Sequence, residues 1–537
     1  MRRLVFLLAA VLALAFASSV PAKTTFVITG RGWGHAVGMS QWGAYGLALD
    51  NWTYQQILAH YYRGTTVDAR SPHTRVGVLL ADGRSSLTTG STASFTVSDG
   101  TISRTRAAAH PVSVTKTSSG RIKVQGITKT FASPATFSSS APLWLGSSRY
   151  RGVLRVSVVD GALRAVNRVG IDHYIRGVVT RESPAWWGDV GAQEAIEAQA
   201  VTARSYALYT LAHGGGKCAG YLCPDVRDQV YGGASSETAN GNEAVAATAG
   251  VVVEHNGAVA QTFFSSSSGG RTAASVDVWG GSVPYLQSEN DPADLNQDNP
   301  NRVWRLRLTG AEMQRRLDLP RTPNDGSITR NSSDRVGSMT FSRPGWSAVV
   351  PGGDSLRWRM NVKSNRFWMG VLTLERRVTR LVYGQATTLD VIARGLTNMR
   401  LQSMPHGATA WADITEVSGN VDVTLRPKKT TSYRLKSSRA AGQPVSIAVA
   451  AKVVFDVTHP AGALTGSVRP RTLAGRTVTV QKKQANGSWA SVATATVNAE
   501  GAFRANFNVT AGAYRALISP PASSGLLAGK SPMLNVS

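Results

Sequence analysis

Cysteine is nearly absent from this chain, which has two among its 537 residues, so a disulfide-dense scaffold is excluded. Acidic residues are also scarce. The chain has 32 Asp and Glu against 58 Lys and Arg, and the resulting net charge of +26 indicates an anionic partner. No RNA-recognition signature, zinc finger, serine nucleophile elbow or fixed-period repeat occurs, which argues against those nucleic-acid modules, a serine hydrolase and a solenoid.

Long apolar runs are confined to the N-terminus. Arg2 and Arg3 precede an apolar stretch over Leu4–Ala17, and Val20–Ala22 has the small residues of a cleavage site. This stretch is shorter than the about 20 residues that a membrane-spanning helix needs. We therefore expect residues 1–22 to be a signal peptide, and the mature protein to be secreted without a stable membrane span.

The excess of basic over acidic residues is greatest toward the C-terminus. Residues 376–537 hold 20 Lys and Arg against 6 Asp and Glu. Nucleic acid is the usual partner of so basic a chain, but export and the missing motifs argue against it. The abundant polyanions outside the cytoplasmic membrane of a bacterium are the acidic polymers of the cell wall. These anionic wall polymers are the predicted partners, held by long-range and salt-sensitive attraction.

Length and apolar spacing predict an α+β protein of three or four domains. Short alternating runs over 73–168 are typical of strands, and Asp172 is expected to cap a helix that ends near Glu182. An Ala-rich helix is expected over about 189–212. The units that we predict after the signal peptide are a mixed region with a β-rich surround (23–375) and two small all-β sandwich modules (376–451 and 452–537).

One carboxyl group has surroundings suited to acid catalysis. Glu182 lies at a predicted helix end beside Pro184, Trp186 and Trp187. Burial against apolar rings disfavours the charged form and raises the pKa of a carboxyl toward the value that a general acid needs. The alternative is that Glu182 is an ordinary capping or salt-bridge residue.

Several motifs together resemble the SpoIID/LytB family. YIRGVV at Tyr174–Val179 precedes Glu182, and AQAVTARSYAL follows at Ala198–Leu208. GHAVGMSQWGAYGLA at Gly34–Ala48 is similar to the other hallmark of the family. The lesser motifs, in order, are DQVYGG (Asp228–Gly233), SSSSGGRT (Ser265–Thr272), DVWGG (Asp277–Gly281) and PYL (Pro284–Leu286).

This resemblance implies a peptidoglycan-directed protein. Sporulation members of the family are lytic transglycosylases, which cleave the MurNAc–GlcNAc linkage of glycan strands, and their catalytic glutamate falls on Glu182. The catalytic region would then be 23–375, with its core at 169–300. One acid suffices for this reaction because the 6-hydroxyl of the sugar attacks in place of water and yields a 1,6-anhydro end. No cofactor is implied.

Other residues are predicted to bind substrate. Arg204 could hold a MurNAc carboxylate, or it could pair with Glu194 or Glu197 on its own helix. Trp186 could stack on a sugar or pack in the core, and Gln199 could bond a sugar hydroxyl. The remaining candidates lie in glycine- or serine-rich segments that could line a cleft or only form tight turns: His35, Ser40, Gln41, Trp42, Ser267 and Ser268.

The two cysteines are expected to form a disulfide. Cys218 and Cys223 lie five positions apart in a chain that we expect to be exported. A zinc site with His213 is the alternative, but no fourth ligand is identifiable, and we predict no metal.

The order of the motifs departs from the family. The Gly-His-x-x-Gly-Met-Ser-Gln motif usually follows the glutamate, whereas here it precedes Glu182 by well over a hundred residues. A circular permutation would preserve the site because domain termini often lie close together. Two other functions stay open: a non-catalytic enhancer that acts with an amidase, and a purely adhesive wall protein that binds through its basic tail.

Overall fold

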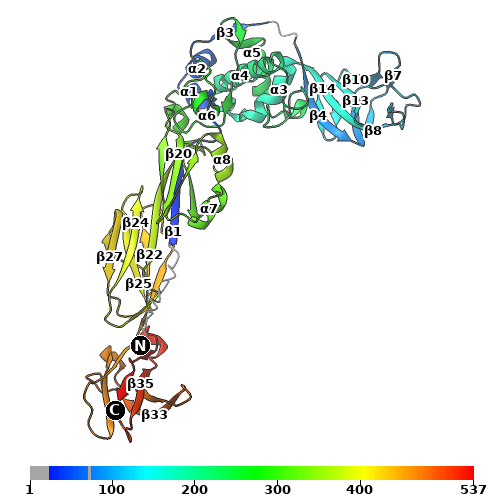
Figure 1. Ribbon diagram of the computed structural model, residues 1–537. Helices are drawn as coiled ribbons and strands as arrows, with labels where there is room; N and C mark the ends of the chain where they lie inside the picture. The colour runs from blue at the N-terminus through cyan, green and yellow to red at the C-terminus, as the bar shows by residue number, and fades with distance from the viewer. Residues whose placement is uncertain (1–22, 71–73) are drawn as a thin grey trace, which may run out of the picture.

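The computed structural model describes residues 23–70 and 74–537, so the predicted signal peptide lies outside the described residues. Figure 1 shows four parts: a helical head, a β-rich arm that projects from it, a stalk below it, and an end module. We define them as the head (31–70 and 171–303), the arm (75–170), the stalk (23–30 and 304–450) and the end module (451–537). The α+β class is confirmed, with strands predominating.

The arm consists of two antiparallel sheets that enclose a core of its own. Their strand orders are β4-β14-β13-β10-β6-β7 and β12-β11-β5-β8-β9. Alternate residues such as Val97, Phe137 and Leu154 point into that core. The strands are β4 (Arg75–Arg84), β5 (Ser86–Ser91), β6 (Phe95–Ser98), β7 (Ser103–Arg106), β8 (Ala109–Lys116), β9 (Ile122–Val124), β10 (Ala135–Ser139), β11 (Leu143–Leu145), β12 (Ser148–Tyr150), β13 (Val153–Val159) and β14 (Ala162–Gly170).

The head is a cluster of helices around the Ala-rich helix α4. The small side chains of Ala195, Ala198 and Ala203 are buried and let the other helices approach closely. The helices are α1 (Gln41–Leu49), α2 (Tyr54–Tyr61), α3 (Ile171–Glu182), α4 (Gln193–Ala212), α5 (Ala239–Ala247) and α6 (Ser275–Trp279), with 3-10 turns η1 (Ala185–Val190), η2 (Gly233–Ser236) and η3 (Pro292–Leu295). The short strands are β2 (Met39–Ser40), β3 (Thr66–Ala69), β15 (Val251–His255), β16 (Ala258–Val259) and β17 (Phe264–Ser265).

Two details of the helix prediction were wrong. The predicted helix over 189–212 is divided, because Gly191 adopts a left-handed conformation (φ +87°) that ends η1 before α4 begins. Asp172 is not the N-cap of α3. That position belongs to Gly170, and Asp172 lies in the first turn, where it pairs with Arg204.

The stalk is built on one five-stranded sheet with the order β18-β1-β22-β24-β27. Phe26 and Ile28 of β1 face α7, α8 and the three-stranded sheet β19-β20-β21, whereas Val27 faces a second sheet, β23-β29-β28-β25-β26. The strands are β1 (Lys23–Gly30), β18 (Trp304–Thr309), β19 (Asp325–Arg330), β20 (Val336–Arg343), β21 (Trp346–Pro351), β22 (Phe367–Arg376), β23 (Arg380–Val382), β24 (Thr387–Arg394), β25 (Arg400–Pro405), β26 (Ala412–Glu416), β27 (Gly419–Leu425), β28 (Thr431–Lys436) and β29 (Val445–Ala450), and the helices are α7 (Gly310–Leu317) and α8 (Asp354–Met360).

The stalk does not divide at the predicted boundary between residues 375 and 376. That boundary falls inside β22, which pairs with β1 on one side and with β24 on the other. The first C-terminal module therefore shares its sheet with the region before it.

The end module has a separate core that includes Val480, Phe503 and Tyr514. Its strands are β30 (Lys452–Phe455), β31 (Ala463–Arg469), β32 (Thr477–Lys483), β33 (Trp489–Thr496), β34 (Ala502–Asn506), β35 (Gly512–Ile518), β36 (Gly529–Lys530) and β37 (Leu534–Val536), with turns η4 (Arg471–Leu473) and η5 (Ala522–Ser524).

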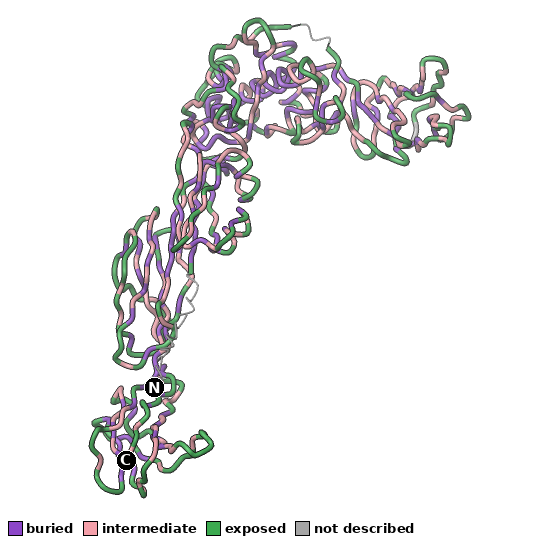
Figure 2. Tube along the Cα trace, viewed as in Figure 1, coloured by how far each residue is buried: buried purple, intermediate pink, exposed green. Residues whose placement is uncertain are grey.

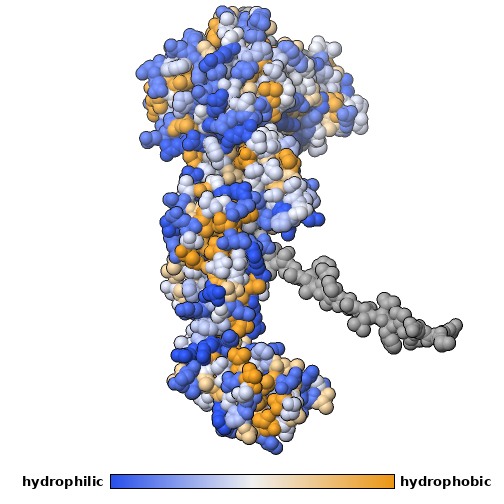
Figure 3. All heavy atoms as spheres, turned by 60° about the vertical axis from the view of Figure 1, so that its left-hand side comes forward, coloured by the Kyte–Doolittle hydropathy of each residue, from blue (hydrophilic) through white to orange (hydrophobic). Residues whose placement is uncertain are grey.

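Burial follows this division into parts. Buried residues are densest in the head and along the stalk sheet (Figure 2). Hydrophobic residues on the face shown in Figure 3 occur in small groups between hydrophilic ones. Within the described residues, no helix is both long and apolar enough to cross a membrane.

Candidate functional site

A cavity of about 730 Å³ lies between the head and the stalk. Its walls come from the glycine-rich segment before α1, the end of α3, the loop after α4, strand β17, and α8 with the residues that follow it. Side chains from distant parts of the sequence meet here. The residues that line it include Trp33, His35, Glu182, Asp228, Trp279 and Lys363.

Glu182 ends α3 at the wall of this cavity and is partly buried. Its Oε1 accepts a hydrogen bond from the backbone N–H of Val230 at 2.7 Å. Burial raises the pKa of the Glu182 carboxyl above its usual range, while the Val230 N–H and the charge of Arg181 limit the rise. The protonated form is therefore favoured more than in a solvent-exposed glutamate, as a general acid requires.

His35 reaches the same cavity because the glycine-rich segment is held against the serine-rich loop. Strand β2 pairs in parallel with β17, so Met39 lies opposite Phe264. Gly34 has a φ of +111°, and a Cβ there would lie 2.6 Å from the Cβ of Ser265. Only glycine fits this close approach, which places the following His35 beside β17.

The His35 ring is neutral and fixed in place. Its Nδ1 accepts a hydrogen bond from the N–H of Val37 at 3.0 Å. Burial lowers the pKa of His35 to about 4, although the charge of Asp354 partly opposes this. Its centroid lies 5.1 Å from that of the Trp279 ring. His35 therefore shapes the cavity as an uncharged ring.

Asp228 is a second carboxylate in the cavity that the search for acids in the sequence missed. Its Oδ2 accepts from the N–H groups of Lys217 (3.1 Å) and Cys223 (2.9 Å). Cys218 and Cys223 form a disulfide, which closes a loop next to Lys217 and fixes the Cys223 donor. The only signal for Asp228 was its position at the start of the DQVYGG motif.

The aromatic wall of the cavity differs from the prediction. Trp187 is 1% exposed and packs in the head core against Trp42 and Tyr45. Trp186 is 45% exposed, but it lies against Tyr45 and does not line the cavity. The aromatic residues that do line it are Trp33, Tyr206, Phe263, Phe264, Trp279 and Trp358.

The three predicted serines are not in the cavity. Ser40 Oγ donates to Asp294 Oδ1 at 2.7 Å and caps α1. Ser267 Oγ donates to the other oxygen of Asp294, and Ser268 Oγ donates to Asp291 at 2.7 Å. All are buried, so these hydroxyls tie the glycine-rich and serine-rich segments to η3.

Gln41 and Gln199 lie behind Glu182 and are buried. The Nε2 of Gln41 donates to Oε1 of Gln199 at 3.2 Å, and Ser183 Oγ donates to the same oxygen at 3.4 Å. This bond joins α1 and α4 to the residue that follows Glu182. Neither glutamine lines the cavity.

Arg204 is fully buried away from the cavity. Its Nε donates to Asp172 Oδ1 at 2.8 Å, and another nitrogen donates to the carbonyl of Val251 at 2.9 Å. The predicted binding of a substrate carboxylate is therefore not available to it, and the alternative pairs with Glu194 or Glu197 are also absent. Arg204 joins α4 to α3 and β15.

Helix α8 supplies cavity residues for which the sequence held no motif. Asp354 and Arg357 form an ion pair at 2.8 Å, and the Arg357 guanidinium lies 4.2 Å from the centroid of the Trp358 ring. All three line the cavity, and Trp358 is 67% exposed.

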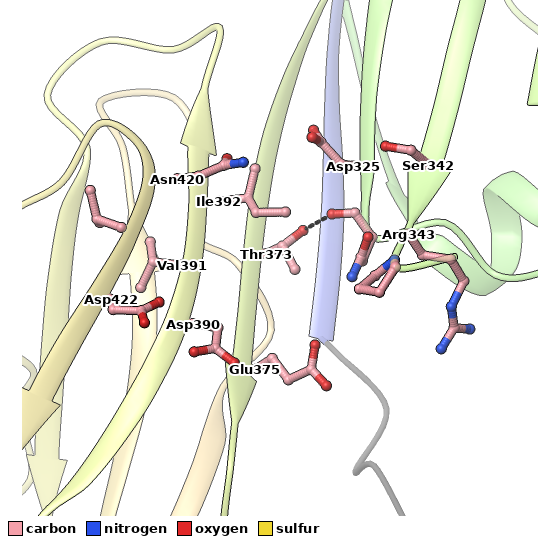
Figure 4. Close-up of a pocket in the computed structure, with 13 residues that line it drawn as sticks. Asp325, Ser342, Arg343, Thr373, Glu375, Asp390, Val391, Ile392, Asn420 and Asp422 are labelled. Carbon is pink, nitrogen blue, oxygen red and sulfur yellow. Dashed lines mark hydrogen bonds between the residues drawn. The ribbon is translucent and has the colours of Figure 1, made fainter. Parts of the chain in front are cut away.

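A second cavity of about 440 Å³ lies in the stalk and is lined by acids (Figure 4). Arg377 pairs with Asp390 and Asp422, and Arg394 pairs with Asp325. Three of the carboxylates that line this cavity are therefore already paired with arginines. None of the residues from the family motifs lines it. No group of three or more His, Cys, Asp or Glu suited to a metal ion occurs in the described residues.

Fold and cavity together define an α+β protein that presents one carboxyl with a raised pKa at an aromatic cavity wall. Residues 159–255, which contain α3, α4 and Glu182, match the family model described as "Stage II sporulation protein" (SpoIID). This part of the chain therefore matches the SpoIID family, which confirms the family resemblance for the motifs that lie within it.

Two relatives from Bacillus subtilis (strain 168) are similar to the chain. It is 34% identical over 234 residues to a protein named "Amidase enhancer", covering 42% of this chain and 30% of that protein. It is 28% identical over 233 residues to "Stage II sporulation protein D", covering 40% of this chain and 64% of that protein. The chain thus spans less than two thirds of either relative.

One similar solved structure adds nothing to this assignment. Chicken CNTN1 FN1–FN3 domains match with 12% identity and a TM-score of 0.12, covering 40% of this chain and 97% of that one. A likeness this weak supports no conclusion about fold or function.

Proposed function

We propose that this protein is a secreted, cell-wall-associated lytic transglycosylase that cleaves the MurNAc–GlcNAc linkage of peptidoglycan glycan strands. The observation that carries the proposal is the position of Glu182, whose carboxyl has a raised pKa in a cavity that it shares with His35. These two residues come from the two main motifs of the family, in reversed order along the chain. Their meeting in one cavity supports a permuted but intact site.

In the proposed reaction, Glu182 first donates its proton to the oxygen that bridges the two sugars, and the bond from that oxygen to the anomeric carbon breaks. The 6-hydroxyl of the same MurNAc then attacks the anomeric carbon, and Glu182, now a carboxylate, takes the hydroxyl proton. Glu182 is regenerated and no water is consumed. In this proposal Asp228, which lines the same cavity, balances the positive charge that develops at the anomeric carbon.

The products test this proposal directly. Glycan strands freed of stem peptides, incubated with the full chain, should yield fragments with 1,6-anhydro-MurNAc ends, detected by mass spectrometry as a deficit of one water. Reducing ends in place of anhydro ends would identify a hydrolase, and intact strands would contradict any cleavage.

The pH dependence of cleavage should move when Arg181 is changed. Glu182 donates only when protonated, so kcat/KM falls as pH rises through its pKa. The charge of Arg181 lowers that pKa, so in Arg181→Gln the pKa rises further and the descending limb moves to higher pH. Lys123→Gln, an exposed change in the arm, is the control and should leave the profile in place. An unmoved limb in Arg181→Gln would show that another group governs it.

Enhancement of an amidase is the second candidate function, favoured by the name of one relative. Under this alternative the cavity binds glycan, and a separate amidase cleaves the stem peptides. A mixture of the full chain with a wall amidase distinguishes the two: faster peptide release without anhydro ends supports the enhancer.

A further inference from the structure

Two backbone segments, residues 31–34 and 363–368, run side by side from the wall of the cavity toward the stalk, and we call this pair the ladder. The N–H of Arg31 donates to the carbonyl of Arg366 at 3.0 Å, and the N–H of Gly34 donates to the carbonyl of Lys363 at 2.9 Å. These bonds continue the pairing of β1 with β22, which run side by side up the stalk (Figure 1). Side chains on this ladder are therefore held in a fixed order, starting from Trp33 and Lys363 at the cavity.

Two exposed tryptophans on the ladder each face cations. Trp33 is 50% exposed, and Lys363 Nζ lies 5.2 Å from its ring centroid. Trp368 is 39% exposed, with the guanidinium carbons of Arg330 and Arg31 at 4.6 and 5.6 Å from its centroid. Arg366 is a third cation near Trp368, at 5.8 Å from its centroid. The cation–π contacts thus hold charged groups beside two indoles that remain partly exposed.

Positive charge is in excess along the ladder. Arg330 and Arg366 share one carboxylate, that of Asp334. Neither Arg31 nor Lys363 forms an ion pair within the described residues, and the Lys363 ammonium donates only to the side-chain carbonyl of Asn301, at 2.8 Å. Lys363 shares the cavity with Glu182, Asp228 and Asp354, but no carboxylate of the described residues pairs with it or with Arg31, so both cations are available to an anionic ligand.

We propose that Arg31, Trp33, Lys363 and Trp368 form an extended subsite for an acidic glycan strand, next to the cavity. Pyranose rings would stack on the two indoles, and carboxylates carried by the sugars would pair with Arg31 and Lys363. All four residues lie outside the part of the chain that matches the family model. The inference rests on the proposed function, because it takes the strand that is cleaved at Glu182 to be the strand that lies along the ladder.

Binding measurements with an uncleaving protein test the subsite. The full chain carrying Glu182→Gln serves as the parent, and Arg31→Gln with Lys363→Gln is added to it. Affinity for peptide-free glycan, whose lactyl carboxylates are free, should fall about tenfold and become less sensitive to salt. Glycan whose carboxylates have been reduced to alcohols should bind the parent and the variant equally.

The control is Lys123→Gln with Lys129→Gln, which removes the same charge from exposed positions in the arm and should leave affinity unchanged. Arg31→Lys with Lys363→Arg keeps both charges and should retain binding, which separates loss of charge from loss of folding. The subsite would be overturned if adding Arg31→Gln and Lys363→Gln left the affinity for glycan unchanged. It would also be overturned if these changes weakened binding only to a phosphate polymer such as teichoic acid. If the native chain produces anhydro ends but the Arg31 and Lys363 changes do not affect binding, the subsite alone is rejected. If those changes weaken binding but the native chain cleaves no glycan, the proposed function alone is rejected.

Discussion

Replacing Glu182 with glutamine should slow glycan cleavage by roughly 10²- to 10⁴-fold, the usual contribution of a general acid. The amide has the same shape, and its oxygen can still accept from the Val230 N–H, so the cavity should keep its form. It has no proton of suitable acidity to donate to the bridging oxygen. We expect kcat to fall while glycan affinity stays within about twofold, since the lost interaction belongs to the transition state. Initial rates of anhydro-end formation and equilibrium binding measure the two effects.

The head offers a matched control in Glu197. Burial and the charges of Glu194 and Glu243 raise the pKa of Glu197 to about 7, yet this residue lies on α4 outside the cavity. Glu197→Gln should cleave glycan at the parental rate. Equal rates in the two glutamine variants would refute the assignment of Glu182 as the acid, whatever the products are.

Replacing Trp187 with alanine should lower the free energy of unfolding of the head by about 3–5 kcal/mol. Its indole is 1% exposed and packs against Trp42 and Tyr45, at centroid distances of 5.2 and 5.0 Å. Removing the indole would leave an empty space inside the head core, and the buried neighbours could fill only part of it. The chain has separate cores, so calorimetry should show a lower temperature for the head transition, with the end-module transition unmoved.

The adjacent tryptophan is the control for this change. Trp186 is nearly half exposed, so Trp186→Ala should cost less than about 1 kcal/mol. A similar loss from both variants would mean that the two indoles are not divided between core and surface as the structure places them.

Local features of the head could be predicted from the sequence because their causes are local. The helix that ends near Glu182 was predicted in this way, and the structure has it as α3 (Ile171–Glu182). The alanines of α4 made it recognisable as a helix that others approach closely. Glu182 was identified from its own neighbours and from a family motif, and the structure places it at a cavity.

Contacts between distant residues could not be predicted in the same way. Trp186 and Trp187 follow Glu182 in sequence, but the η1 turn carries them away, and α6 and α8 supply Trp279 and Trp358 instead. The partner of Arg204 is on another helix, 32 positions away. Local periodicity holds no information about such pairs.

The boundary within the stalk failed for a related reason. Near residue 376 the sequence changes from mixed to purely strand-like, which suggests a domain border. A strand can nevertheless pair with a sheet that was begun by an earlier part of the chain. Lys23 lies opposite Leu374, and Arg376 lies opposite Leu389, so one sheet takes strands from both sides of the supposed border. Strands that pair across about 350 positions of sequence leave no signal in the local sequence pattern.

The continuous stalk sheet also has a mechanical consequence. All eight residues of β1 pair with β22, and β1 runs directly into the segment that carries His35. Hydrogen bonds between antiparallel strands lie perpendicular to the strands, so tension along the stalk loads many rungs together instead of opening them one by one. If the C-terminal modules were held by a stretched wall, the tension would reach the mouth of the cavity through this sheet.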